Sequence, residues 1–375
     1  MEELENKKNI LLKNKERILK MRNTKEKAEI VDAYTHLLRY YFEVLDENDY
    51  DLLEELSIDD EFVGKYDNLV LTDTQKDVDK MYSCVDSLYE KYCKIIETFK
   101  ENDYCTHAYF INAKVNPQKM KNLVYHFFES LGEDVLNLYL KMADGKNILA
   151  NNMQMGCMGY TVDTLPIDNP CIVVQNAQKN LTFYLTLVHE VGHAYQFYIQ
   201  RNQKNYSSLM PYVEITSHLF ERLFLDYLKN VHEDKYCFVF EEEDYNYFLN
   251  EVSASKIFCD LMINKNITCI DPYCLDYACL VPEDKINDEL INDCGYVLNY
   301  ENDINLTILR YSIGKVIAMY FHEKLKNDFN HEWKKYKDFL CTVNYLPMNE
   351  VMEKYFDVDL VTEKIKQFTK SYHGR

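Results

Sequence analysis

The chain has 375 residues, of which 47% are hydrophobic and 28% charged, a balance that excludes a disordered protein and allows a large buried core. Its formal net charge of −20 argues against a nucleic acid or an anionic membrane as partner, because both are bound through clustered Lys and Arg. Only 9 glycines and 7 prolines interrupt the chain, which favours long helices over a turn-rich β fold.

The first part of the chain, residues 1–145, is predicted to be a helical region. Residues 1–25 are dense in Lys, Glu and Asn with few apolar side chains, and we expect a solvated helix or a frayed arm there. Apolar residues at helical spacing predict one helix within residues 26–56 and a second from residues 73–74 to Ile96.

A third helix of this region is marked at both ends. Asn116 followed by Pro117 is typical of a helix N-terminus, because Asn can cap free backbone N–H groups and Pro suits the first helical position. Gly132 is expected to break the helix.

The composition changes after Gly145, and residues 146–375 are predicted to form a second region. Residues 146–180 hold closely spaced glycine and proline. Within them, Cys171–Gln175 is a short β-branched run and is predicted to be a strand. The edge of a strand just before the next helix can hold an extended peptide by main-chain hydrogen bonds.

The most informative segment is Asn180–Ile199, which is apolar on almost every side and is therefore predicted to be a buried helix. It contains His189-Glu190-Val191-Gly192-His193, the pattern H-E-x-x-H. Residues four apart share a helix face, so the two histidines can direct two ring nitrogens at one zinc ion. Glu190 is then the natural general base on the water that zinc activates. The alternative is a pair of core histidines with other partners.

The rest of the chain is again predicted to be mostly helical. A polar loop after Arg201 is followed by a helix from Pro211, and residues 266–303 look irregular. Apolar spacing predicts further helices over 245–264, over 305–325 and in short pieces across the last forty residues.

A catalytic zinc keeps three protein ligands and one open position, so a third ligand is needed. The best candidate is Glu214, on the helix that follows the loop. Glu221 and His218 lie on the same helix and are predicted to orient a ligand histidine from the second shell. The alternative for Glu214 is an acidic residue at a solvated helix start.

These segments resemble the zinc oligopeptidases of the oligopeptidase F and thimet oligopeptidase type, which are gluzincins with H-E-x-x-H and a distal Glu. Thr186–Ala194 looks like the family's T-L-x-H-E-x-G-H-A, and Glu214–Glu221 is similar to its E-[IV]-x-S-x-x-x-E. Gly159-Tyr160 and the strand Ile172–Asn176 resemble the run that precedes the family's motif helix. Arg310–Gly314 looks like its K-Y-A-x-G element. The likeness covers about residues 150–325.

This sequence departs from the family in three ways. It is shorter, mainly in the N-terminal helices, and the loop between His193 and Glu214 is shorter by a few residues. Positions where the family often carries tyrosine or histidine hold Leu306, Thr307 and Leu309.

The resemblance implies a tyrosine that stabilises the oxyanion of the transition state, an electrostatic role. Tyr311 is the matching residue. Tyr296 or Tyr300, from the irregular segment, are alternatives.

The resemblance therefore implies a mainly α, zincin-like helical metallopeptidase with a small β-sheet beside the active-site helix. We expect a metalloendopeptidase of the oligopeptidase kind, with one zinc per chain on His189, His193 and Glu214, and with Glu190 and Tyr311 as catalytic residues. A channel between helical halves would admit short peptides and exclude folded proteins.

Other functions stay open. A shortened and catalytically idle relative would bind peptides or a protein partner, and a zinc enzyme could also act on another substrate. A helical structural protein without metal is a third possibility. Twelve cysteines without a C-x-x-C pair, and an N-terminus charged from its second residue, predict a cytoplasmic protein with reduced thiols and no signal peptide.

Overall fold

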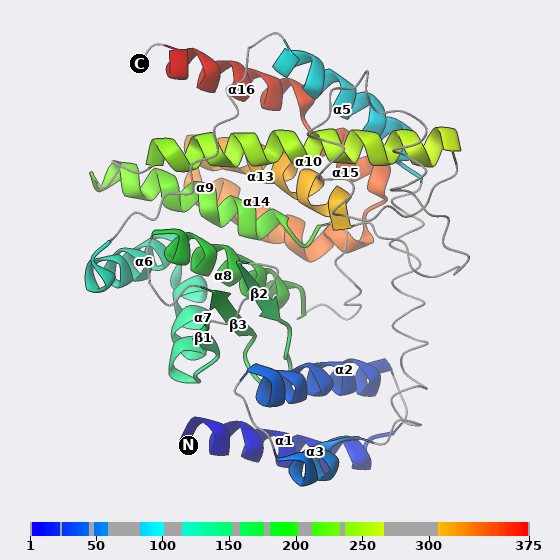
Figure 1. Cartoon of the computed structure of the whole chain (residues 1–375), viewed down its shortest axis with the longest axis vertical. Helices are drawn as coiled ribbons and strands as arrows, with labels where there is room; N and C mark the ends of the chain where they lie inside the picture. Colours follow the sequence, from blue (N-terminus) through cyan, green and yellow to red (C-terminus); the bar gives the residue numbers. More distant parts are fainter. Residues whose placement is uncertain are drawn as a thin grey trace. The chain divides into compact units, whose positions relative to one another are not determined.

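The chain is mostly helical, with a small sheet beside the motif helix, as predicted (Figure 1). The computed structural model describes residues 2–22, 25–44, 49–58, 83–100, 115–151, 158–175, 181–201, 212–232, 237–265 and 307–373. The chain divides into two compact units. Unit 1 comprises Met1–Asp73 and Asn112–Ser207, and unit 2 comprises Thr74–Ile111 and Ser208–Arg375.

The two units do not follow the predicted boundary between residues 145 and 146. Each unit is assembled from two separate stretches of chain, because the N-terminal helices find their apolar partners far along the sequence. In unit 1 they share a core with Cys171 and Val173, and in unit 2 the helix Val85–Lys100 packs against helices from the last 140 residues.

Unit 2 is a set of packed helices around α13 (Thr307–Asn327). Residues Ile313, Val316 and Ile317 of α13 are fully buried, because other helices surround it. In the described part of unit 2, the helices are α5 (Val85–Lys100), α9 (Ile215–Asn230), α10 (Cys237–Lys265), α13, α14 (Phe329–Thr342), α15 (Met348–Tyr355) and α16 (Val358–His373), with a 3₁₀ turn η4 (Val343–Tyr345). Helices are found over the described residues for which they were predicted, although α10 begins at Cys237, eight residues before the predicted start at 245. The helix start predicted at residues 73–74 and the irregular segment predicted over 266–303 lie outside the described residues. In the part of the chain that is described, no helix is both long and apolar enough to cross a membrane.

Unit 1 contains the sheet, whose described strands are β1 (Ile148–Asn151), β2 (Gly159–Val162) and β3 (Cys171–Gln175). Their order is β1-β3-β2, with β1 parallel and β2 antiparallel to β3. The predicted strand is confirmed as β3, but it lies in the middle of this sheet. The peptide-binding edge expected of it is therefore wrong, because β3 is paired on both sides and the edges among the described strands are β1 and β2.

Each face of the sheet is covered by a different set of helices. Side chains alternate between faces along a strand. Cys171 and Val173 of β3 and Tyr160 and Val162 of β2 pack against the N-terminal helices. The opposite face meets α8 (Leu181–Arg201), the motif helix. This helix also contacts α6 (Pro117–Leu131) and α7 (Glu133–Asp144), which explains why its apolar residues are buried.

Helix α6 begins and ends at the residues that the sequence predicts. The Asn116 side chain accepts a hydrogen bond from the Lys119 backbone N–H at 3.0 Å, and Pro117 is the first helical residue. Gly132 ends the helix with φ 140°, a conformation that favours glycine.

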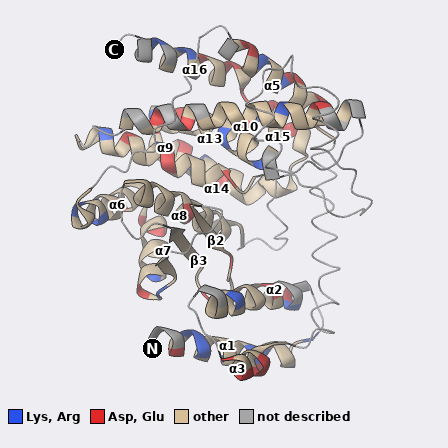
Figure 2. Cartoon of the chain, in the orientation of Figure 1, with Lys and Arg blue, Asp and Glu red and all other residues tan. Residues whose placement is uncertain are grey.

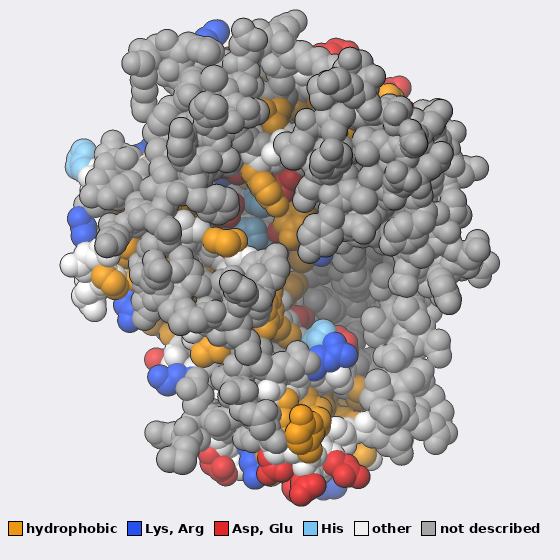
Figure 3. All heavy atoms as spheres, viewed as in Figure 1, with side chains coloured by type: hydrophobic (Ala, Val, Ile, Leu, Met, Phe, Trp, Pro, Cys, Tyr) orange, Lys and Arg blue, Asp and Glu red, His pale blue; other side chains and the backbone are white. Residues whose placement is uncertain are grey.

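The N-terminal helices are α1 (Glu2–Lys20), α2 (Lys25–Arg39) with a π-helical turn η1 (Tyr40–Val44), and α3 (Tyr50–Leu56). The helix expected within residues 1–25 is confirmed as α1, but the expectation that it is solvated is wrong, because Leu11 and Ile18 are fully buried. Helix α3 carries the exposed acids Asp51, Glu54 and Glu55. Figure 2 shows red on this helix, and acidic side chains are visible at the lower end of Figure 3.

A buried lysine ties α1 to the sheet. Lys7 is 1% exposed, forms an ion pair with Asp168 and donates a hydrogen bond to Oδ1 of Asn147 at 2.8 Å. The Asn147 amide in turn donates to the carbonyl oxygen of Asn169 at 2.6 Å. Because Asn147 and Asn169 flank strands β1 and β3, this network fixes α1 against the start of both strands.

Replacement of Lys7 by Met should destabilise unit 1 by about 3 kcal/mol, because Asp168 would keep a partly buried charge without its partner. The free energy of unfolding from urea titration at pH 7 measures this. Lys13→Met, at an exposed position of the same helix, is the control. Equal effects of the two substitutions would contradict the assigned role of Lys7.

Candidate active site

Unit 1 carries the H-E-x-x-H motif on α8. The Nε2 atoms of His189 and His193 lie 3.1 Å apart, with the two ring planes at 77°. Two nitrogens bound to one tetrahedral zinc at 2.0–2.1 Å are separated by roughly 3.4 Å. The pair therefore fits two adjacent ligand positions. A hydrogen bond between the two rings is the other arrangement that this distance allows.

Glu190 contacts the sheet through its side chain. It is 3% exposed, and its Oε2 accepts a hydrogen bond from the Thr161 hydroxyl of β2 at 2.6 Å. A distance this short is typical of an O–H donor to an ionised carboxylate. Glu190, the predicted general base, is thus a buried carboxylate that accepts a hydrogen bond from Thr161.

Unit 2 carries the predicted third ligand. Glu214 is the residue before α9, is 3% exposed, and accepts a hydrogen bond from the Ser217 hydroxyl on its backbone oxygen at 2.9 Å. Its Oε1 lies 3.5 Å from Nε of Arg310. Burial contradicts the alternative of a solvated helix start for this residue.

The glycine of the Arg310–Gly314 block explains how α13 approaches Glu214. A Cβ atom at Gly314 would lie 2.6 Å from Cβ of Glu214 and 3.0 Å from its backbone carbon. Only a residue without a side chain fits there, so the position of Glu214 depends on Gly314.

The two residues predicted to be in the second shell bind each other. Nδ1 of His218 lies 3.0 Å from Oε2 of Glu221, and the His218 side chain is 5% exposed. The Tyr311 ring lies beside His218, with ring centroids 6.3 Å apart. Unit 2 thus gathers four of the predicted site residues along α9 and α13: Glu214, His218, Glu221 and Tyr311.

Arg310 is a site residue that we did not assign from the sequence. Its Nη2 lies 3.3 Å from the Tyr311 hydroxyl, and its guanidinium carbon lies 5.0 Å from the centre of the Tyr311 ring. The sequence offered one signal for it, its place at the start of the R-Y-S-x-G block. That block did not indicate that a positive charge would be needed there. Arg310 links the predicted oxyanion donor to the predicted third ligand.

Leu309, which stands where the family often has a polar donor, is fully buried. Tyr296 and Tyr300, the alternative oxyanion donors, lie outside the described residues, as does Leu306.

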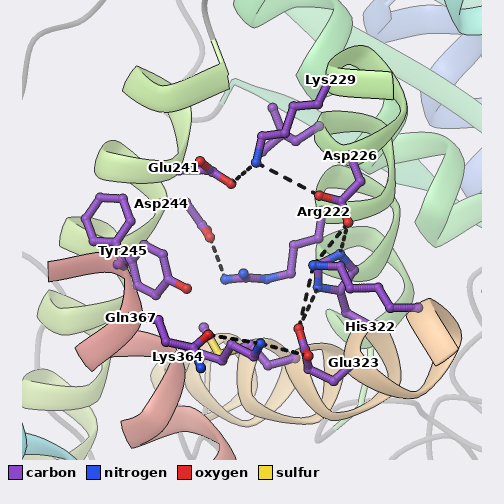
Figure 4. Close-up of a pocket in the computed structure, with 14 residues that line it drawn as sticks. Arg222, Asp226, Lys229, Glu241, Asp244, Tyr245, His322, Glu323, Lys364 and Gln367 are labelled. Atoms are coloured by element: carbon purple, nitrogen blue, oxygen red, sulfur yellow. Dashed lines mark hydrogen bonds and ion pairs between the residues drawn. The ribbon is translucent and has the colours of Figure 1, made fainter. Parts of the chain in front are cut away.

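A second group of charged residues in unit 2 lines a cavity of about 240 Å³ between α9, α10, α13 and α16 (Figure 4). Arg222 pairs with Asp244, Lys229 with Glu241, and Lys364 with Glu323. Because cations and acids here neutralise each other, the cavity is best described as a charged junction between four helices.

The pair of His322 and Asp226 gives this junction a pH dependence. Nε2 of His322 lies 2.8 Å from Oδ2 of Asp226. Burial lowers the pKa of His322, against the effect of Asp226, so the histidine is a neutral donor at pH 7. Burial would raise the pKa of Asp226, but the hydrogen bond from His322 and the charge of Lys326 lower it to about 2.

Comparison with known proteins gives matches in structure only. No family model matches the chain, and no curated protein matches it. A crystal structure of a provisionally named oligoendopeptidase F from Bacillus anthracis str. Ames is similar, with TM-score 0.50, 17% identity, and coverage of 92% of this chain and 63% of that one. PZ peptidase A, solved with an inhibitor, has TM-score 0.52, 13% identity, and coverage of 94% and 69%. This chain thus spans about two thirds of their length, and it shares their fold.

The close approach of α13 to Glu214 can be tested with Gly314→Ala. In an unhindered helix this change would stabilise the protein by about 1 kcal/mol. Here we expect a loss of about 1–3 kcal/mol, because the added methyl group meets the Glu214 backbone. Urea unfolding measures the difference, and a variant as stable as the wild type would contradict the contact.

The junction can be tested with Asp226→Asn. Because the pKa of Asp226 is below its unfolded value, its contribution is present above about pH 4 and is lost as the pH falls through about 2. We expect the variant to be about 2 kcal/mol less stable at pH 7, with the difference shrinking toward pH 2. Unfolding experiments over this range, with Asp338→Asn at an exposed position as control, measure it.

Proposed function

We propose that this chain is a zinc-dependent peptidase that hydrolyses peptide bonds in short oligopeptides. The observation that carries the proposal is the pair of ring nitrogens of His189 and His193, 3.1 Å apart on a buried helix, with the Glu190 carboxylate between them in sequence and held beside the sheet. The fold shared with oligoendopeptidase F and PZ peptidase supports the peptide substrate class.

One zinc ion per chain is proposed, with His189, His193 and Glu214 as its ligands. The residues suit the ion: two imidazoles that converge and one buried carboxylate are a hydrolytic zinc donor set. Zinc in such a site lowers the pKa of water to about 7 and polarises a carbonyl group.

The protein's own groups carry the proton transfers and the charge stabilisation. Glu190 takes a proton from the attacking water and gives it to the leaving amine. The hydroxyl of Tyr311 donates to the oxygen on which negative charge develops, and the Arg310 guanidinium adds a positive charge next to that hydroxyl. Arg310 thereby compensates for the family donors replaced by leucine and threonine.

The substrate backbone is proposed to pair with β2. This strand lies at the edge of the described sheet and contacts the motif helix, whereas β3 is paired on both sides. An extended peptide added to a free edge is held through its main chain, which suits substrates of varied sequence.

The alternative function is a catalytically idle peptide-binding protein. The buried Leu309, at a position where the family often has a donor, favours it. The ionised, donor-stabilised Glu190 disfavours it, because a binding protein has no need of a base.

Two substitutions separate the roles of the motif residues. Glu190→Gln should keep one zinc per chain and lower turnover by at least about 10³-fold, because the base is lost. His193→Ala should lose both zinc and turnover. Zinc content by mass spectrometry and cleavage of a quenched fluorescent peptide library measure both effects.

His126→Ala, at an exposed histidine of α6, is the control and should match the wild type. Wild-type protein with one zinc and no cleavage would point to the idle binding protein. Absence of zinc from the wild type would overturn the proposal.

A further inference from the structure

We infer that Thr161 of β2 is a positioning residue for the general base, and that Gly159 makes room for the carboxylate that it holds. This inference rests on the proposed function, in which Glu190 is the base. It assigns to the edge strand a second role, next to that of binding the substrate backbone.

The strand presents both residues to the motif helix. Gly159 and Thr161 are two positions apart and therefore share one face of β2. The residues between and after them, Tyr160 and Val162, pack on the other side with the N-terminal helices. The face that meets α8 thus consists of one small residue and one hydroxyl donor.

The Thr161 hydroxyl reaches two oxygen atoms of Glu190. It lies 2.6 Å from Oε2 and 3.0 Å from the backbone carbonyl oxygen. A hydroxyl has one proton to donate, and the shorter contact, to the ionised carboxylate, takes it. The hydroxyl therefore determines where one carboxylate oxygen lies.

Gly159 accommodates the other carboxylate oxygen. A Cβ atom at this position would lie 3.0 Å from Oε1 of Glu190 and 2.7 Å from Cγ2 of Thr186. It would also lie 3.0 Å from the backbone oxygen of Val173. Because these contacts are closer than a Cβ atom tolerates, a side chain here would have to shift the carboxylate or the residues around it.

Strand β2 keeps the Thr161 hydroxyl in place because β2 is itself paired with β3. Thr161 pairs with Ile172 of β3, and Ile172 is fully buried. A glutamate side chain has three rotatable bonds, so an unheld carboxylate can adopt several orientations. A displacement of about 1 Å from the productive position can cost about a hundredfold in rate.

The test is a matched pair, Thr161→Val and Thr161→Ser. Valine keeps the shape and removes the donor. We expect kcat to fall about ten- to a hundredfold, with KM changed less than about twofold and zinc content unchanged. Serine restores the hydroxyl and should recover most of kcat. Thr182→Val, on α8 about two turns before Glu190, is the control and should have the kcat and KM of the wild type.

A second measurement needs neither zinc nor activity. In metal-free protein, Thr161→Val and Glu190→Ala should lower Tm by less together than the sum of their separate effects, because each substitution removes the same hydrogen bond. Additive changes in Tm, or a Thr161→Val enzyme with wild-type kcat, would overturn the inference. A wild type that binds zinc without cleaving peptides, but shows the coupled Tm effects, would instead overturn the proposed function, and the positioning role with it.

Discussion

A carboxylate inside an apolar helix is unfavourable by several kcal/mol unless a donor meets it. Glu190 is such a carboxylate, and the Thr161 hydroxyl meets it from the edge of the sheet. The same constraint organises the rest of the molecule: Lys7 is buried only because Asp168 and Asn147 receive it. The contact between β2 and the motif helix and the contact between α1 and the sheet therefore each include a polar group that pairs a charge removed from water.

Most of the secondary structure was accessible from the sequence because its signals are local. The Asn116 cap and the buried motif helix are examples, since neighbouring residues determine both. Strand order was not accessible, because pairing joins segments whose mutual fit is not encoded in either alone. The buried face of α1 was missed because Lys7 reads as a solvated residue until its partners beyond residue 145 are known.

The candidate site, too, has one part that the sequence predicts and another part that depends on tertiary packing. The spacing of His189 and His193 is sufficient to predict a metal pair, because a helix has only one geometry. The partners of the site residues come from other elements: Thr161 lies 29 positions before Glu190, and Arg310 approaches Glu214 from a different helix. These contacts are set by tertiary packing. A short motif can therefore suggest the chemistry while leaving its support unknown.

The split composition of unit 2 has a consequence for biosynthesis. Helix α5 belongs to the first stretch of unit 2, which ends at residue 111. Helices α10 and α16, against which α5 packs, are synthesised more than a hundred residues later. At about 5–20 residues per second, the apolar stripe of Leu88, Tyr92 and Ile95 waits on the order of ten seconds for its partners. During that interval the nascent chain exposes an apolar surface, which chaperones that bind emerging apolar segments would recognise.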